Sequence, residues 1–165
     1  MNFIVVVDEN YAIGKDGGLI YSLPSDLRYF KEKTTGKVVV MGDKTYMSLP
    51  KRPLPNRVNI VMTLGGEDFQ GAITVRSVEE LKTVLREFND EDVFVIGGAS
   101  IYNLLMDYCD KAYITKIRAH EPADTYIRNI EKQGNWTKTS ESEVMHENGI
   151  DFSFCVFDND DVREL

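Results

Sequence analysis

The chain has 165 residues with 19 basic and 27 acidic side chains, a formal net charge of −8. Its length predicts a single domain over residues 1–165, and the 42% hydrophobic content excludes a disordered tail protein. No apolar run approaches the roughly 20 residues of a membrane span, and the start lacks the pattern of a signal peptide. We therefore expect a cytoplasmic protein with no membrane partner.

The charge is unevenly distributed along the chain. Residues 141–165 contain eight acidic side chains and one basic, whereas residues 27–66 contain eight basic and two acidic. A local basic segment in an acidic chain favours a small anionic ligand over nucleic acid, which usually meets a basic domain. The alternative is a solvated basic surface. Two cysteines and two histidines have no metal-ligand spacing, so we expect no metal site.

The predicted elements of the first half begin with a buried strand at 2–7. A helix over 25–34 follows, with Ser25 as its N-cap and Asp26 in its first turn, where a carboxylate suits the helix dipole. Three further apolar runs predict strands at 38–41, 58–62 and 72–75.

The second half begins with a helix over 77–88, which opens on the capping box of Ser77 and Glu80. A strand, a helix and a strand are then predicted at 93–96, 99–108 and 112–117. Segments 135–144 and 150–157 flank Glu147-Asn148-Gly149, a turn signal typical of an antiparallel hairpin. This order predicts an α/β fold with three layers, a mostly parallel central sheet of about eight strands, the C-terminal hairpin at its edge and about four helices.

Asp26 is the first candidate for chemistry. On a helix it shares a face with Phe30, with Leu27 on its flank, and burial beside such groups raises the pKa of a carboxyl. A buried carboxylate can hold a planar nitrogen heterocycle by paired hydrogen bonds and promote its protonation. The alternative is an acid that only caps a helix.

Two further segments point to an anionic ligand. Gly97-Gly98 lies between a strand and a helix, where backbone N–H groups can bind a diphosphate, although the turn lacks the third glycine of GxGxxG. The alternative is a tight turn without a ligand. In the segment 38–63, Lys44 and Thr45 can meet phosphate oxygens, and the rigid turn 52–57 can aim an arginine at a carboxylate.

These segments resemble dihydrofolate reductase. The matching blocks occur in the family's order and span nearly the whole chain: Ile13-Gly14, Leu23-Pro24-x-Asp26-Leu27-x-x-Phe30-Lys31, Met41-Gly42 through Arg52-Pro53-Leu54-Pro55-x-Arg57-x-Asn59, Ile96-Gly97-Gly98-x-x-x-Tyr102, and Tyr113-Ile114-Thr115 with Asp124-Thr125. Each block alone is weak, but five in register are highly specific.

The resemblance implies reduction of 7,8-dihydrofolate to tetrahydrofolate by hydride transfer from NADPH in a monomeric enzyme of one-carbon metabolism, which antifolates would inhibit. Asp26 would bind the pterin and support protonation at N5, with Thr115 in the same network. Arg57 would bind the α-carboxylate of the glutamate tail. The pterin and benzoyl pocket would be lined by Val5, Val6, Leu27, Phe30, Leu49, Leu54 and Ile96.

The cofactor site implied by the resemblance draws on several segments. Residues 8–23 would be a loop that closes over the nicotinamide, and a cis peptide is expected between Gly97 and Gly98. Thr63 and Arg76 would approach the 2′-phosphate. The other expected cofactor contacts are Val6, Ile13, Gly14, Leu19, Gly42, Asp43, Lys44, Thr45, Met62, Leu64, Ile96, Ala99, Ser100, Ile101, Tyr102 and Thr125.

The chain departs from the family pattern at several of these positions. Ile20-Tyr21 replaces Pro-Trp, and we expect the Tyr21 hydroxyl to take over the catalytic role of holding a water near the substrate. Asp43 replaces an arginine, and Leu64 and Ser100 replace residues that meet the 2′-phosphate in some relatives, which weakens the case for a strong NADPH preference. Two other functions remain open: a pyrimidine reductase of riboflavin synthesis, and a pterin- or nucleotide-binding protein without turnover.

Overall fold

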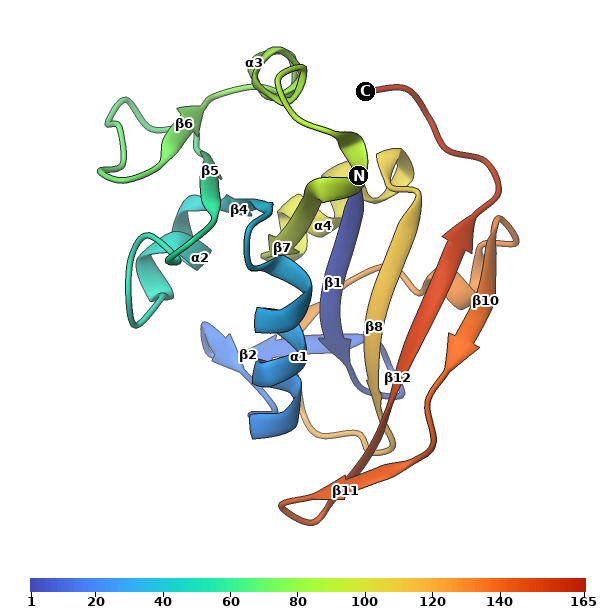
Figure 1. Ribbon diagram of the computed structural model, residues 1–165. Coiled ribbons are helices and arrows are strands. Elements are labelled where there is room, and N and C mark those ends of the chain that lie inside the picture. The colour runs from blue at the N-terminus through green and yellow to red at the C-terminus, as the bar shows by residue number, and fades with distance from the viewer.

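The computed structural model describes residues 1–165 and centres on one large twisted sheet (Figure 1). Its strands are β1 (Asn2–Val7), β4 (Val38–Gly42), β5 (Val58–Met62), β6 (Ile73–Val75), β7 (Val93–Gly97), β8 (Lys111–Ile117), β10 (Trp136–Glu141) and β12 (Ile150–Asn159). They lie in the order β10-β12-β8-β1-β7-β4-β5-β6, and β11 (Met145–Glu147) pairs with β12. Pairing is parallel from β8 to β6 and antiparallel around β12, which confirms the predicted mixed α/β sheet.

Four α-helices cover the two faces of this sheet: α1 (Pro24–Thr34), α2 (Asp43–Ser48), α3 (Val78–Leu85) and α4 (Ala99–Leu105). Short 3₁₀ turns, η1 (Asp90–Asp92), η2 (Met106–Tyr108) and η3 (Ile130–Lys132), complete the helical elements. Successive side chains of a strand point to opposite faces. Val38 accordingly packs in the large core with Leu81 of α3, whereas Val39 packs with Tyr46 of α2. The apolar runs without alternation are therefore strands buried on both faces.

Helix α1 packs against β8 and β12 through its side chains. Tyr29 stacks on Phe154 of β12 with 4.2 Å between the ring centroids, and the Lys33 ammonium lies 5.2 Å from the ring centroid of Tyr113 on β8. The predicted N-cap is wrong, because Leu23 occupies the N-cap and Pro24 the first turn. The Ser25 hydroxyl is hydrogen-bonded to Glu147 instead.

Two other helices end earlier than predicted. In α3 the Ser77 hydroxyl accepts from the Glu80 amide at 3.0 Å, but the Glu80 carboxylate accepts from the Arg76 amide, not from that of Ser77. The helix stops at Leu85, and single turns complete the segment to residue 88. Likewise α4 stops at Leu105 and continues as η2.

Residues expected to form a loop contain a small second sheet. β2 (Ala12–Lys15) pairs with β3 (Gly18–Leu19) and with β9 (Thr125–Tyr126). A Cβ on Gly14 would lie only 3.0 Å from the Gly18 carbonyl oxygen, so glycine permits this close pairing. The amide of Asp16 also donates to the Asp124 carboxylate at 2.9 Å. The segment 8–23 is therefore held against residues 124–126.

The C-terminal hairpin differs from the prediction in its first strand. Residues 135–144 do not form one strand: β10 pairs with the far half of β12 and has a register shift near Lys138, while β11 makes the tight turn through Asn148-Gly149. Between them, Ser142 exchanges two hydrogen bonds with the Phe154 backbone, both 2.8 Å long.

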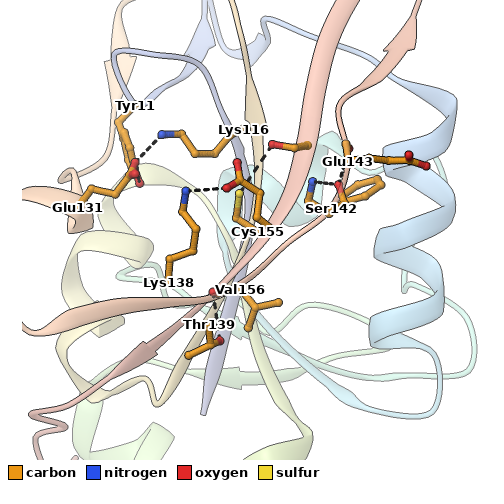
Figure 2. A network of polar contacts seen from close by, with 12 residues as sticks. Tyr11, Lys116, Glu131, Lys138, Thr139, Ser142, Glu143, Cys155 and Val156 are labelled. Atoms are coloured by element: carbon orange, nitrogen blue, oxygen red, sulfur yellow. Dashed lines mark hydrogen bonds and ion pairs between the residues drawn. The ribbon is translucent and has the colours of Figure 1, made fainter.

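A polar cluster of Tyr11, Lys116 and Glu131 fixes the segment after β1. Figure 2 shows Tyr11 and Lys116 directed at the Glu131 carboxylate, to which they donate at 2.8 and 2.6 Å. Burial, followed by the hydrogen bond to Glu131, raises the pKa of the Tyr11 hydroxyl far above its ordinary value. Tyr11, which is 1% exposed, thus anchors the start of the 8–23 segment.

No helix of the structure is long and apolar enough to cross a membrane.

Candidate functional site

The expected site residues gather at the carboxyl ends of the parallel strands. Gly42, Thr63 and Gly97 end or follow the neighbouring strands β4, β5 and β7. In open α/β sheets, ligands bind in the crevice outside this edge. The strand order therefore brings together segments that are 21 to 55 residues apart in sequence.

Asp26 and Thr115 meet between α1 and β8. The Thr115 hydroxyl, on a residue that is 1% exposed, donates to Oδ1 of Asp26 at 2.6 Å. Burial raises the pKa of the Asp26 carboxyl, the Thr115 hydrogen bond opposes that rise, and the nearby Glu147 adds to it. No protein group donates to Oδ2 of Asp26, so that oxygen is available to a ligand. Asp26 is half-buried, and its catalytic role stays a prediction.

A contact that the sequence did not predict positions α1. Glu147 on β11 accepts from the Ser25 amide at 2.9 Å and from the Ser25 hydroxyl. These bonds lower the pKa of the Glu147 carboxyl and tie the first turn of α1, which carries Asp26, to the C-terminal hairpin. Only the turn signal beside Glu147 was visible in the sequence, and it does not indicate this partner.

The apolar residues of the expected substrate pocket lie on α1, on β7 and in the segment after α2. Leu27 is 57% exposed on α1. Leu49, Leu54 and Ile96 pack together against the small core on the α2 side of the sheet.

The two expected pocket residues of β1 point in different directions. Val6 is half-buried on the α1 side of the sheet, in the cluster around Leu23. Val5 is 7% exposed and belongs to the core shared with Tyr102 of α4. The structure therefore brings Val6 to the α1 side and leaves the role of Val5 a prediction.

Arg57 is held in place by three contacts. Its Nη1 donates to the Thr34 hydroxyl at 3.0 Å, its Nε donates to the Pro55 carbonyl at 2.9 Å, and the guanidinium carbon lies 5.9 Å from the Phe30 ring centroid. Partial burial lowers the pKa of this guanidinium. With two N–H groups engaged, the remaining donors can bind a carboxylate bidentately.

Asn59 fixes the loop that carries Arg57. It is 2% exposed; its amide oxygen accepts from the Leu54 amide at 3.0 Å, and its Nδ2 donates to the carbonyls of Leu54 and Arg57. The matching block had included Asn59 without a role. The structure shows that it holds the proline-rich turn, whose Arg52-Pro53 bond is cis.

The glycine turn forms a cradle with space for a phosphate group. The Gly97-Gly98 peptide is cis, as expected, and Gly97 has φ of 131°. A Cβ on Gly98 would lie 3.4 Å from Oγ1 of Thr45, which is close contact, and a Cβ on Gly42 would lie 3.1 Å from Ile101. Side chains here would fill the cradle. The residues present therefore fit the diphosphate of a dinucleotide cofactor.

Helix α4 is fixed beside this cradle. The Tyr102 hydroxyl donates to the Ile4 carbonyl of β1 at 2.7 Å, and burial raises the pKa of that hydroxyl far above its ordinary value. The amides of Ala99 and Ser100 open the helix, where backbone donors lack partners within the helix.

The outer part of the expected cofactor site centres on Asp43. Its Oδ2 accepts from the Thr63 hydroxyl at 2.8 Å, and its Oδ1 from the Lys44 amide at 2.7 Å. Arg76 donates to the Gly65 carbonyl and to Asp68, both at 3.0 Å. Leu64 beside them is 98% exposed. Sequence alone did not show that Asp43 and Thr63 touch.

The remaining expected cofactor contacts are dispersed. Met62 is 8% exposed within the main core, whereas Leu19 on β3 is 78% exposed. Ile13 packs against the main core from β2, and Thr125 on β9 donates to Asp124 at 2.8 Å. These residues of β2, β3 and β9 are joined through the small sheet and not directly to the glycine turn.

The Tyr21 hydroxyl makes no hydrogen bond to Asp26. It packs with Leu23, Ile117 and Phe152, and its hydroxyl is buried without a hydrogen-bond partner. Burial raises the pKa of that hydroxyl most, and the negative charge of Asp8 raises it further. A catalytic role for Tyr21 stays a prediction.

Comparison with known proteins identifies the family. The sequence profile of dihydrofolate reductase matches residues 1–159. The dihydrofolate reductase of Bacillus subtilis is 37% identical over 161 residues, covering 96% of this chain and 94% of that protein, and that of Haemophilus influenzae is 36% identical over 135 residues, covering 82% and 80%. A solved structure of dihydrofolate reductase from Enterococcus faecalis, complexed with NADP(H) and RAB-propyl, superposes with a TM-score of 0.84 at 32% identity, covering 97% of this chain and 96% of that one. The chain belongs to the dihydrofolate reductase family.

Proposed function

We propose that Asp26, Thr115 and Arg57 carry the reaction of this family in the present chain, the reduction of 7,8-dihydrofolate to 5,6,7,8-tetrahydrofolate with NADPH. The observation that supports this assignment best is the half-buried Asp26 carboxylate, which has one oxygen on Thr115 and the other without a protein donor. A planar heterocycle that presents two N–H donors matches a carboxylate in this state.

The substrate is bound at both of its ends. Asp26 accepts from N3 and the 2-amino group of the pterin, and the Thr115 hydroxyl orients the carboxylate for these bonds. Leu27 and Phe30 on α1, with Leu49 and Leu54 opposite, cover the apolar middle of the molecule. Arg57 binds the α-carboxylate of the glutamate tail, and Thr34 and Asn59 hold the arginine and its loop.

The reduction adds a hydride to C6 and a proton to N5 of dihydrofolate. NADPH supplies the hydride when bound, and Gly42, Thr45, Gly97 and Gly98 leave room for its diphosphate. Asp26 promotes proton uptake at N5, because a carboxyl with a raised pKa is closer to the range in which acid–base catalysis is efficient. The segment 8–23 excludes water from the nicotinamide when it closes.

We further propose that the chain acts as one domain, as a monomer and in the cytoplasm. The main core draws residues from Met1 to Phe157, so distant parts of the sequence share one interior. Both cysteines are buried and free, as in proteins of reducing compartments. Light scattering on the purified chain gives the monomer mass if this is correct, and cell fractionation tests the compartment.

The function is tested by the absorbance of NADPH. We expect the absorbance to fall when dihydrofolate is added to the purified chain, with one NADPH oxidised per tetrahydrofolate formed. Binding of both ligands without oxidation would favour the binding-protein alternative. Oxidation only with a ribosylated pyrimidine would favour the riboflavin-pathway alternative.

A further inference from the structure

The adenosine end of the proposed cofactor site contains a carboxylate. Asp43 follows β4, Thr63 follows β5, and both lie at the strand edge that continues outward from the glycine turn after β7. Because a dinucleotide bound with its diphosphate at Gly97-Gly98 extends along this edge, its second ribose comes to the Asp43–Thr63 pair. This placement rests on the proposed function.

The hydrogen bonds of Asp43 leave it able to bind one more donor. Each carboxylate oxygen accepts one hydrogen bond, from the Lys44 amide or the Thr63 hydroxyl. An ionised carboxylate has about four acceptor sites, so two remain. In dinucleotide-binding folds, an acid beyond a strand end accepts from the ribose 2′-hydroxyl, and an arginine accommodates a 2′-phosphate.

Acidic side chains outnumber basic ones around Asp43. The Arg76 guanidinium is engaged by the Gly65 carbonyl and the Asp68 carboxylate. The hollow of about 1140 Å³ that adjoins Asp43 has three acids and two bases in its lining: Asp43, Glu67, Asp68, Lys44 and Arg52. A 2′-phosphate bound here would lie near the Asp43 carboxylate, while Arg76 is already bonded to Gly65 and Asp68.

We propose that Asp43 accepts the ribose 2′-hydroxyl of NADH, so that this chain uses NADH besides NADPH with little discrimination between them. In the NADH reaction, the hydride passes from the dihydronicotinamide to C6 of dihydrofolate, N5 gains a proton from water, and NAD⁺ leaves. Leu64, exposed beside this pair, offers its apolar surface to the adenine.

The proposal is tested by measuring the dissociation constants of NADP⁺ and NAD⁺ by calorimetry. The values of kcat/KM for NADPH and NADH are measured beside them. We expect the two oxidised cofactors to bind wild-type protein within about tenfold of each other, a difference of about 1.4 kcal/mol. Asp43→Asn removes the repulsion and should tighten NADP⁺ by about tenfold, while NAD⁺ weakens several-fold. Glu143→Gln is the matched control: it removes one exposed charge near the opposite edge of the sheet and should change neither constant.

Two results would overturn the proposal in different ways. If wild-type protein binds NADP⁺ more than about a hundredfold tighter than NAD⁺ and Asp43→Asn leaves that ratio unchanged, Asp43 is not at the ribose. If neither cofactor binds and no NADPH is oxidised with dihydrofolate, the proposed function fails and this inference fails with it.

Discussion

Replacing Asp26 by asparagine separates its chemical role from its cost in stability. The variant keeps an oxygen for the Thr115 hydroxyl but loses the charge and the ability to take up a proton. Acid–base groups typically contribute 10²–10⁴-fold to a rate, so we expect turnover at neutral pH to fall by about 10²–10³-fold. Cofactor binding should remain, because Asp26 lies on α1 and not at the glycine turn.

The same substitution should stabilise the protein at neutral and alkaline pH. Weakening the Thr115 hydrogen bond costs about 1 kcal/mol, but removing a mostly buried charge returns more than that. We expect a net gain of about 1–2 kcal/mol, which for a chain of this size raises Tm by about 3–6 °C.

The stability gained by Asp26→Asn should depend on pH. Burial raises the folded-state pKa of Asp26 above its unfolded value, so folded wild-type protein binds more protons in that range and loses stability as pH rises through the folded-state pKa. Thermal melts from pH 3.5 to 8 should therefore show the Tm advantage of Asp26→Asn growing with pH. Glu32→Gln, an exposed change on the same helix, is the control. A Tm difference that stays constant with pH, or turnover equal to wild type, would refute the reasoning.

Three other substitutions test separate parts of the site. Arg57→Lys loses the bidentate geometry and the Thr34 contact, so KM for dihydrofolate should rise by about 10–100-fold with little change in kcat, and a substrate lacking the glutamate should be unaffected. Thr115→Val removes a hydrogen bond that lowers the Asp26 pKa; the apparent pKa of the pH–rate profile should move upward, and an unmoved profile would exclude their coupling. Gly97→Ala puts a side chain at φ of 131°, 3.4 Å from the Tyr102 ring, and should lower the free energy of unfolding in urea by about 1–3 kcal/mol; equal midpoints would contradict this.

Local sequence patterns determined most elements of the central sheet, though not the small sheet of β2, β3 and β9. The apolar runs at 2–7 and 58–62 coincide with β1 and β5, because a strand buried on both faces needs apolar residues throughout. The cap at Ser77 was also correct, since its partner Glu80 lies only three residues away. Such signals depend on neighbours along the chain, and the sequence contains them in full.

Helix and strand ends followed the sequence less closely, because contacts from distant segments compete for the same groups. The sequence predicts Ser25 as an N-cap, but its hydroxyl donates to Glu147 on the C-terminal hairpin. The Glu80 carboxylate likewise accepts from the Arg76 amide instead of closing the predicted capping box. No local pattern indicates such partners.

For the site, the sequence by itself indicated the candidate residues and the ligands that their chemistry suits. It identified Asp26 as a carboxylate beside apolar groups, placed glycines at a strand end, and showed an acidic chain with a basic segment at 27–66. These follow from side-chain chemistry and spacing. The family blocks, which occur in register along nearly the whole chain, imply the same residues.

Only the tertiary structure decided which of these residues touch. Thr115 donates to Asp26 across 89 residues because α1 packs against β8. Thr63 donates to Asp43 across 20 residues because β4 and β5 are parallel neighbours whose carboxyl ends meet at one edge. The same packing raises the pKa of Asp26 and leaves the Tyr21 hydroxyl buried without a partner. Burial and hydrogen bonding depend on which residues are neighbours in space, and local sequence patterns do not specify these neighbours.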